Sequence, residues 1–280
     1  MKETIKAYIP KMIGFSLNAG GVLFPNWAAE KAVQIFSTPR KGKIRDKDLP
    51  FLEGSIQTKL KYQDIDIQTY MWEGEGPTIL FVHGWESNAA RWRNFIKKFR
   101  RKKCRIIAVD APAHGQSGSE VFNAILYAHC LEVVCKYYQP EMIVGHSVGG
   151  VASLFLLTQI ATVSVKKAVI MAAPSELPQI FGKFYSILGL QKHVAKGLES
   201  RFEEKYKFKV ADFSLQSFVK TLTIPGLVIH DEEDFVAPYI DGVNVAKNWQ
   251  NARLFSTKGL GHSLNSEIVT NEVCRFLLEE

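Results

Sequence analysis

One serine in this sequence lies in a context that would let its hydroxyl attack an electrophilic carbon. Residues 145–149 read Gly-His-Ser-Val-Gly, with the serine at position 147. The mostly apolar residues 141–144 before this motif predict a strand, and residues 150–157 after it predict a helix. A sharp strand–turn–helix connection would project the hydroxyl above a sheet, and the flanking glycines would let strand and helix pass closely. Ser147 is therefore a candidate nucleophile.

A nucleophilic serine needs a base to take up its proton, and the base needs an anion to orient it. In an open α/β sheet, reactive groups gather at the carboxyl ends of the strands, so we expect both partners on loops that follow strands. His262 lies in a loop of small residues after the last predicted strand. Directly after the strand before it come four acidic residues, Asp231, Glu232, Glu233 and Asp234. The chain order is thus serine, acid, histidine.

Eight segments predict the strands that would position these groups. The first two alternate polar and apolar residues and predict an antiparallel pair at a sheet edge, whereas most of the others are continuously apolar, which is typical of parallel strands buried on both faces. Helical segments alternate with them, which indicates a doubly wound, mostly parallel α/β sheet. The strands are expected at residues 56–62, 64–72, 78–82, 105–109, 142–144, 168–171, 227–229 and 253–256, and the helices at residues 88–101, 121–138, 148–160, 239–249 and 266–278.

Two additions to this α/β core are expected. The core takes residues 51–174 and 221–280, and residues 175–220 predict a small helical cap inserted after the sixth strand. Residues 1–50 predict an N-terminal helical arm, in which the amphipathic residues 9–36 are interrupted by Gly20-Gly21 and Pro25. We expect this arm to pack on the domain, with contact to a membrane surface as the alternative.

Composition limits the partners and the compartment. The chain has 280 residues and a net charge of +7, and its most basic run, residues 97–103, ends a predicted helix, where cations complement the helix dipole. No nucleic-acid motif accompanies that run, so no nucleic-acid partner is expected. The four cysteines form no Cys-x-x-Cys pair and no zinc-like spacing, which predicts reduced thiols. Without a clear signal peptide or an apolar span, a cytoplasmic location is expected.

The motifs together resemble those of the α/β-hydrolase fold superfamily, from about residue 55 to the C-terminus. Two positions depart from the family's pattern: Asp231 stands where the family often has glycine, and Ala113 replaces a common glycine. The motifs that carry the resemblance are the oxyanion loop at residues 81–85, the Asp-x-Pro-Gly-His-Gly-x-Ser loop at 110–117, the nucleophile elbow at 145–150, the acid loop at 230–238 and the histidine loop at 261–262.

The resemblance implies roles for particular residues. Ser147, His262 and Asp234 would form a catalytic triad, with Asp231 as the alternative acid. The backbone N–H groups of Val148 and Trp85 would form the oxyanion hole. This chemistry requires neither a metal ion nor an organic cofactor.

The expected function is hydrolysis of a carboxylic ester or a thioester through an acyl-enzyme, as in a carboxylesterase, on a small-molecule acyl substrate. The same triad also serves lactone, amide and C–C bond cleavage. Two alternatives are a non-catalytic binding protein on a hydrolase scaffold and a membrane-surface lipase that uses residues 9–36 as an interfacial helix. Specificity is expected to reside in the cap.

Overall fold

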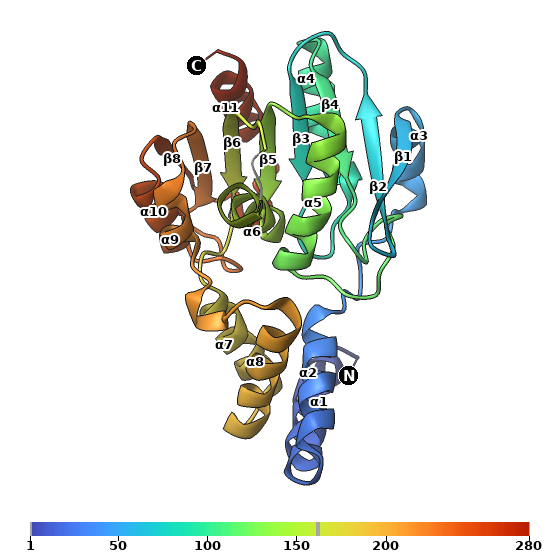
Figure 1. Ribbon diagram of the computed structural model, residues 1–280, viewed down its shortest axis with the longest axis vertical. Helices are drawn as coiled ribbons and strands as arrows, with labels where there is room; N and C mark the ends of the chain where they lie inside the picture. Colours follow the sequence, from blue (N-terminus) through green and yellow to red (C-terminus); the bar gives the residue numbers. More distant parts are fainter. Residues whose placement is uncertain (1, 161–162, 280) are drawn as a thin grey trace. The chain divides into compact units, whose positions relative to one another are not determined.

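The computed structural model describes residues 2–160 and 163–279, which contain one eight-stranded sheet with flanking helices (Figure 1). Contacts divide the chain into two compact units. The core unit comprises Pro39–Ser175 and Leu215–Glu280, and the helical unit comprises Met1–Thr38 and Glu176–Ser214. The contacts thus group the expected N-terminal arm up to Thr38 and most of the expected cap into one unit, whereas residues 39–50 of the expected arm belong to the core unit.

The sheet of the core unit has the order β1-β2-β4-β3-β5-β6-β7-β8. β2 pairs antiparallel with β1 and β4, and all other neighbours are parallel, which confirms the predicted mostly parallel, doubly wound sheet. The predicted strand positions agree with the structure to within a few residues. The strands are β1 (Ile56–Tyr62), β2 (Ile65–Trp72), β3 (Thr78–Val82), β4 (Arg105–Val109), β5 (Met142–His146), β6 (Lys167–Met171), β7 (Gly226–Asp231) and β8 (Ala252–Thr257).

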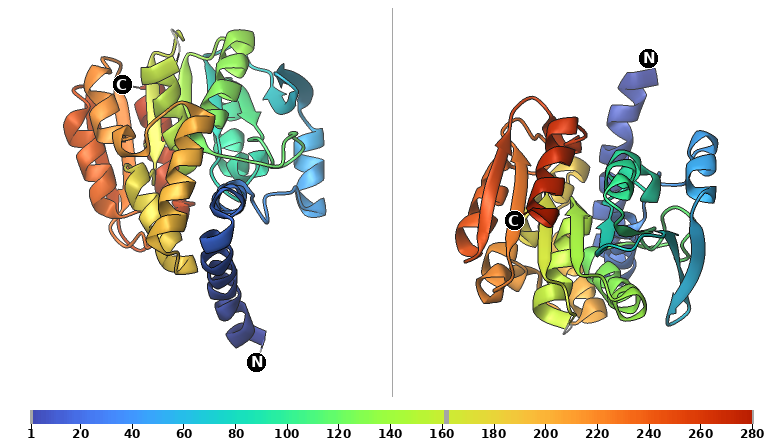
Figure 2. Two further views of the ribbon diagram at one scale, coloured as in Figure 1. Left: turned by 60° about the horizontal axis from the view of Figure 1, so that its bottom comes forward. Right: turned by 90° about the horizontal axis from the view of Figure 1, so that it is seen from above.

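Helices cover both faces of this sheet (Figure 2). Side chains alternate along each strand, so neighbours such as Val169 and Ile170 serve opposite faces. Val169 belongs to the apolar cluster beneath α4 and α11, whereas Ile170 approaches Gly150 of α6. The core-unit helices are α3 (Leu49–Glu53), α4 (Arg93–Arg101), α5 (Ala124–Tyr138), α6 (Val148–Phe155), α9 (Leu215–Phe218), α10 (Tyr239–Asn248) and α11 (Glu267–Leu278).

Phe81 lies at the centre of the apolar layer between the sheet and α4. Its ring centroid is 5.1 Å from that of Trp92, 6.0 Å from that of Phe95 and 5.8 Å from that of Phe99. All four side chains are buried. Their close packing fixes the end of β3 that leads into the predicted oxyanion loop.

The helical unit contains α1 (Lys2–Leu23), α2 (Pro25–Ser37), α7 (Leu177–Leu188) and α8 (Lys192–Tyr206). The expected interruption at Gly20-Gly21 is wrong, because α1 continues to Leu23 and α2 begins at Pro25. A Cβ atom on Gly21 would lie 2.9 Å from side-chain atoms of His193 and Val194, so helix packing favours glycine there despite its low helix propensity. Pro25 has its usual place in the first turn of a helix.

Two sequence expectations concern cysteines and membrane spans. All four cysteines are free and buried. Among residues 2–160 and 163–279, no helix combines the length and the hydropathy that crossing a bilayer would require.

Substituting Phe81 with alanine tests the layer between β3 and α4. We expect Phe81→Ala to lower the free energy of unfolding by about 3–5 kcal/mol, because it removes a fully buried ring and leaves a cavity. Urea unfolding followed by circular dichroism measures this loss. The matched control is Phe235→Ala at a 94% exposed phenylalanine, which should change stability by less than about 0.5 kcal/mol. Equal effects of the two variants would contradict this account of the core.

Candidate active site

Ser147 occupies the sharp turn between β5 and α6. Its backbone has φ 54° and ψ −128°, a conformation that non-glycine residues rarely adopt. Its N–H donates to the carbonyl of Met171 on β6, and its own carbonyl accepts from Gly150 at the start of α6. A Cβ atom on Gly149 would lie 2.3 Å from the carbonyl oxygen of His83, so only glycine fits where α6 passes the chain after β3. These contacts hold the strained turn in place.

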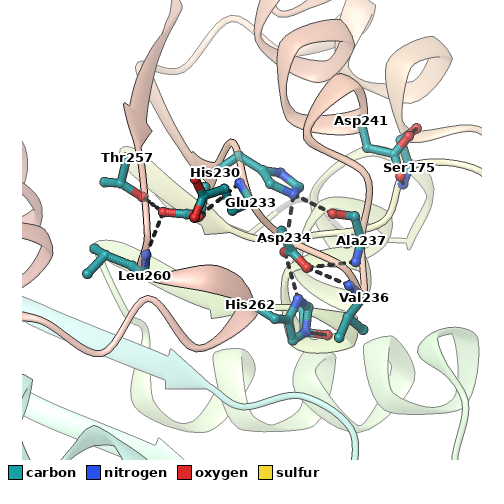
Figure 3. Close-up of polar contacts among 12 residues, drawn as sticks. Ser175, His230, Glu233, Asp234, Val236, Ala237, Asp241, Thr257, Leu260 and His262 are labelled. Atoms are coloured by element: carbon teal, nitrogen blue, oxygen red, sulfur yellow. Dashed lines mark hydrogen bonds and ion pairs between the residues drawn. The ribbon is translucent and has the colours of Figure 1, made fainter.

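The structure brings Ser147, His262 and Asp234 together, although they are far apart in sequence. The Nε2 atom of His262 lies 2.9 Å from the Oγ of Ser147. On the other side of the ring, Nδ1 lies 2.8 Å from Oδ2 of Asp234 (Figure 3). If His262 is the Nδ1–H tautomer, its Nε2 is free to accept the serine proton. This arrangement can generate a serine alkoxide and stabilise the imidazolium that forms.

Asp234 is held as an anion by several donors. Its Oδ1 accepts from the backbone N–H groups of Val236 and Ala237, at 2.8 and 2.9 Å. His230 Nε2 lies 3.3 Å from Oδ2 and 3.0 Å from the carbonyl of Ala237 (Figure 3). Burial raises the pKa of this carboxyl, but the hydrogen bonds from His230, His262 and Ala237 outweigh that effect and hold the pKa well below its usual range. Asp234 therefore stays charged at neutral pH.

Asp231, the alternative acid, has other partners. Its Oδ2 accepts from the hydroxyl of Thr257 at 2.7 Å and from the N–H of Leu260 at 3.0 Å, and its Oδ1 accepts from the N–H of Glu233 at 3.0 Å. It thus joins the start of the acid loop to the segment that leads from β8 to His262. Asp231 therefore links two loops through hydrogen bonds, whereas Asp234 contacts the imidazole of His262.

His146, directly before the candidate nucleophile, contacts the loop of His262. Its Nε2 lies 2.8 Å from the backbone carbonyl of His262, to which it donates. Burial, reinforced by nearby Arg91 and His262, lowers the pKa of His146 well below its usual range, so the ring is neutral and its Nδ1 is a buried atom without a partner among the described residues. This bond fastens the imidazole loop to the elbow, and no sequence signal predicted it.

The loop after β3 lies against the elbow. A Cβ atom on Gly84 would be 2.8 Å from Cβ of Ser147, so any larger residue would displace the serine. The backbone N–H groups of Trp85, which follows Gly84, and of Val148, the first residue of α6, have no acceptor among the described residues. Both predicted oxyanion donors thus lie on the two segments that meet at Ser147. The indole of Trp85 is 37% exposed and contacts the rings of Phe122 and His114.

Two buried histidines hold the loop after β3. His83 donates from Nδ1 to the carbonyl of Gly84 and accepts at Nε2 from the N–H of Ala111. Burial lowers its pKa to about 3, so it remains a neutral connector. His114 accepts in the same way from the N–H of Glu86. Both residues support the loop backbone.

No group of three or more His, Cys, Asp or Glu side chains among the described residues is arranged to hold a metal ion. The groups gathered at the carboxyl edge of the sheet are instead those of proton transfer and nucleophilic attack: a hydroxyl, an imidazole, a buried carboxylate and two backbone N–H donors.

Comparisons with known proteins agree with this architecture. Residues 77–188 match the family described as alpha/beta hydrolase fold. A non-heme chloroperoxidase from Streptomyces lividans is 24% identical over 256 residues, covering 72% of this chain and 92% of the relative. A protein from Mycoplasma pneumoniae that is named as an esterase/lipase is 26% identical over 109 residues, and there the match covers 37% of this chain and only 40% of the relative. The solved structure of an esterase from Exiguobacterium antarcticum superposes with a TM-score of 0.62 at 16% identity, over 79% of this chain and 99% of that one.

Acid titration tests the charge of Asp234. Because its pKa is lowered in the folded protein, the carboxylate adds stability above its unfolded pKa, near 3.8, and this contribution disappears as the pH falls through the folded pKa. We expect Asp234→Asn to cost about 1.5–3 kcal/mol at neutral pH and progressively less in acid. Urea unfolding of both proteins across this pH range measures the difference. A difference that stays constant with pH would contradict the inferred charge.

Two substitutions of His146 test its contact with the His262 loop. His146→Leu leaves the His262 carbonyl without its donor, and we expect a fluorophosphonate to label Ser147 about 10–100-fold more slowly, because the imidazole loses its position. His146→Gln retains an N–H donor and should recover part of that rate. The pH profile of labelling should keep its shape, since His262 remains the base. Wild-type rates in both variants would show that the bond does not position His262.

Proposed function

Because this chain is a member of the α/β-hydrolase fold superfamily, we propose that it is a serine hydrolase that cleaves a carboxylic ester or a thioester. The observation that carries the proposal is the continuous hydrogen-bond chain from Ser147 through His262 to Asp234, with distances of 2.9 and 2.8 Å. The hydrolase names among its relatives support the reaction class. Ester-bond specificity, as in a carboxylesterase, is the finer part of the proposal.

Acylation begins with attack of the Ser147 hydroxyl on the carbonyl carbon of the substrate. His262 takes the proton as the C–O bond forms, and Asp234 stabilises the resulting imidazolium. The backbone N–H groups of Trp85 and Val148 donate to the oxyanion of the tetrahedral intermediate. Val148 contributes twice, because it also stands at the positive end of the α6 dipole. Return of the proton to the leaving alcohol or thiol breaks the intermediate and leaves an acyl-serine.

Deacylation repeats these steps with water as the nucleophile. His262 removes a proton from the water molecule, the same two N–H groups hold the second oxyanion, and the imidazolium returns the proton to Ser147 as the acid is released. All groups needed for this cycle come from the core unit. Every proton transfer in the cycle passes through Nε2 of His262, so the position of this one atom governs both half-reactions.

Substitution of Ser147 tests the proposal. We expect wild type to hydrolyse short p-nitrophenyl esters and the corresponding thioesters, and Ser147→Ala to lose at least about 10³-fold in kcat/KM, since it removes the group that forms the acyl intermediate. Rates with matched oxygen and sulfur esters show which leaving group the site accepts. The control is Ser164→Ala, at an exposed serine of the core unit, which should leave the rate unchanged.

Fluorophosphonate labelling separates the hydrolase from a non-catalytic binding protein. Wild type and Ser164→Ala should be labelled, and Ser147→Ala should not, while all three keep the same unfolding transition. Retained turnover in Ser147→Ala would refute the assignment of the nucleophile. A folded wild-type protein that neither turns over esters nor reacts with the probe would favour the binding role.

A further inference from the structure

Helix α1 directs its small residues toward the other helices of its unit. A Cβ atom on Gly14 would lie 1.8 Å from the carbonyl oxygen of Leu188 in α7, and one on Gly21 would lie 2.9 Å from Val194 in α8. Leu17, between these glycines on the same face, is 3% exposed. The helix therefore packs closely on α7 and α8 through the face that carries residues 14, 17 and 21, and its opposite side faces away from them.

That opposite side carries the bulky apolar side chains. Tyr8, Met12, Phe15, Val22 and Leu23 recur at helical spacing and are 63%, 67%, 74%, 72% and 75% exposed, respectively. Phe24 and Trp27, 64% and 47% exposed, continue the surface into the first turn of α2. We call these seven residues the outer face. An ordinary surface helix is apolar inward and polar outward, so α1 has the reverse of the usual pattern.

The outer face is also free of charge. Between residues 8 and 27, the sequence has a single charged residue, Lys11, whose amine donates to the carbonyl of Ser186. A contiguous exposed apolar surface of this kind marks a site of association, because scattered single residues would need no explanation.

Charge indicates which partner covers the outer face. The helical unit has eleven Lys and Arg residues against seven Asp and Glu, and within α1 there are three lysines and one glutamate. A second copy of this chain would bring the same positive charge to the contact, whereas an anionic lipid surface brings the opposite charge. Four of the seven outer-face residues are aromatic, namely Tyr8, Phe15, Phe24 and Trp27, and aromatic side chains favour the boundary between lipid headgroups and acyl chains.

We propose that the outer face of α1 docks this protein on the surface of anionic phospholipid bilayers, with the helix axis in the plane of the membrane. The apolar side chains enter the acyl boundary, and the lysines of the helical unit interact with the headgroups. No helix among residues 2–160 and 163–279 meets the requirements of a span, so the contact is interfacial. This docking depends on the helical unit and is independent of the proposed hydrolysis at Ser147.

Co-sedimentation of the full chain with vesicles tests this proposal. We expect binding to vesicles of phosphatidylcholine mixed with phosphatidylglycerol, weaker binding to phosphatidylcholine alone, and weakening by salt. Replacing Phe15 and Val22 together with glutamine should reduce binding to the mixed vesicles by at least about tenfold, because two apolar side chains leave the acyl boundary. The pair Met12→Gln with Leu23→Gln should act in the same way, and keeps the test decisive if the first pair disturbs folding.

The matched control replaces two exposed apolar residues of the core unit, Tyr137 and Ile268, which are 60% and 59% exposed, with glutamine. This control and Ser147→Ala should both bind vesicles as wild type does, so a failure of the hydrolase proposal leaves this test intact. Absence of binding at low salt, or equal binding by the outer-face variants and the control, would overturn the proposal. A wild-type dimer in sedimentation velocity that the outer-face variants dissociate would overturn it as well, because a second copy would then cover the face.

Discussion

The close approach of the chain after β3 to the turn after β5 is the constraint on which the site depends. Gly149 lies where a Cβ atom would meet the carbonyl of His83, and Gly84 lies where one would meet Ser147 itself. Because no side chain separates these segments, the strained serine and the N–H groups of Trp85 and Val148 share one small region. A single methyl group at either glycine would force them apart, and packing around Phe81 holds the β3 side of this contact in place.

The sequence was most informative where burial is complete. Strands β3, β4, β5 and β7 have continuous apolar patterns because both of their faces are covered, and their positions were predictable to within a few residues. The motifs also indicated which loops carry the serine, the acids and the histidine. They indicated the break at Pro25, where α2 begins, but wrongly added one at Gly20-Gly21, because these glycines contribute through tertiary packing that their local propensity opposes.

Within the site, the residue types alone did not determine which side chains contact His262 and its loop. Asp231 and Asp234 are chemically alike and three positions apart, and only the turn of the acid loop decides which one faces the imidazole. His146 is even less visible in the sequence, because its contact is with a backbone carbonyl that lies 116 residues later. A hydrogen bond to a backbone carbonyl does not depend on the type of residue that carries the carbonyl. Such contacts therefore leave no signal in the sequence, and they were found only in the structure.

The discontinuous composition of the helical unit has a consequence for biosynthesis. Its first helices leave the ribosome early, but α7 and α8, on which α1 is seated, follow well over a hundred residues later. Until α7 and α8 have been translated, the face of α1 that carries Gly14, Leu17 and Gly21 has neither of these helices to pack against. During this interval α1 exposes both its outer face and the face that later packs on α7 and α8, which makes the nascent chain prone to chaperone binding and aggregation.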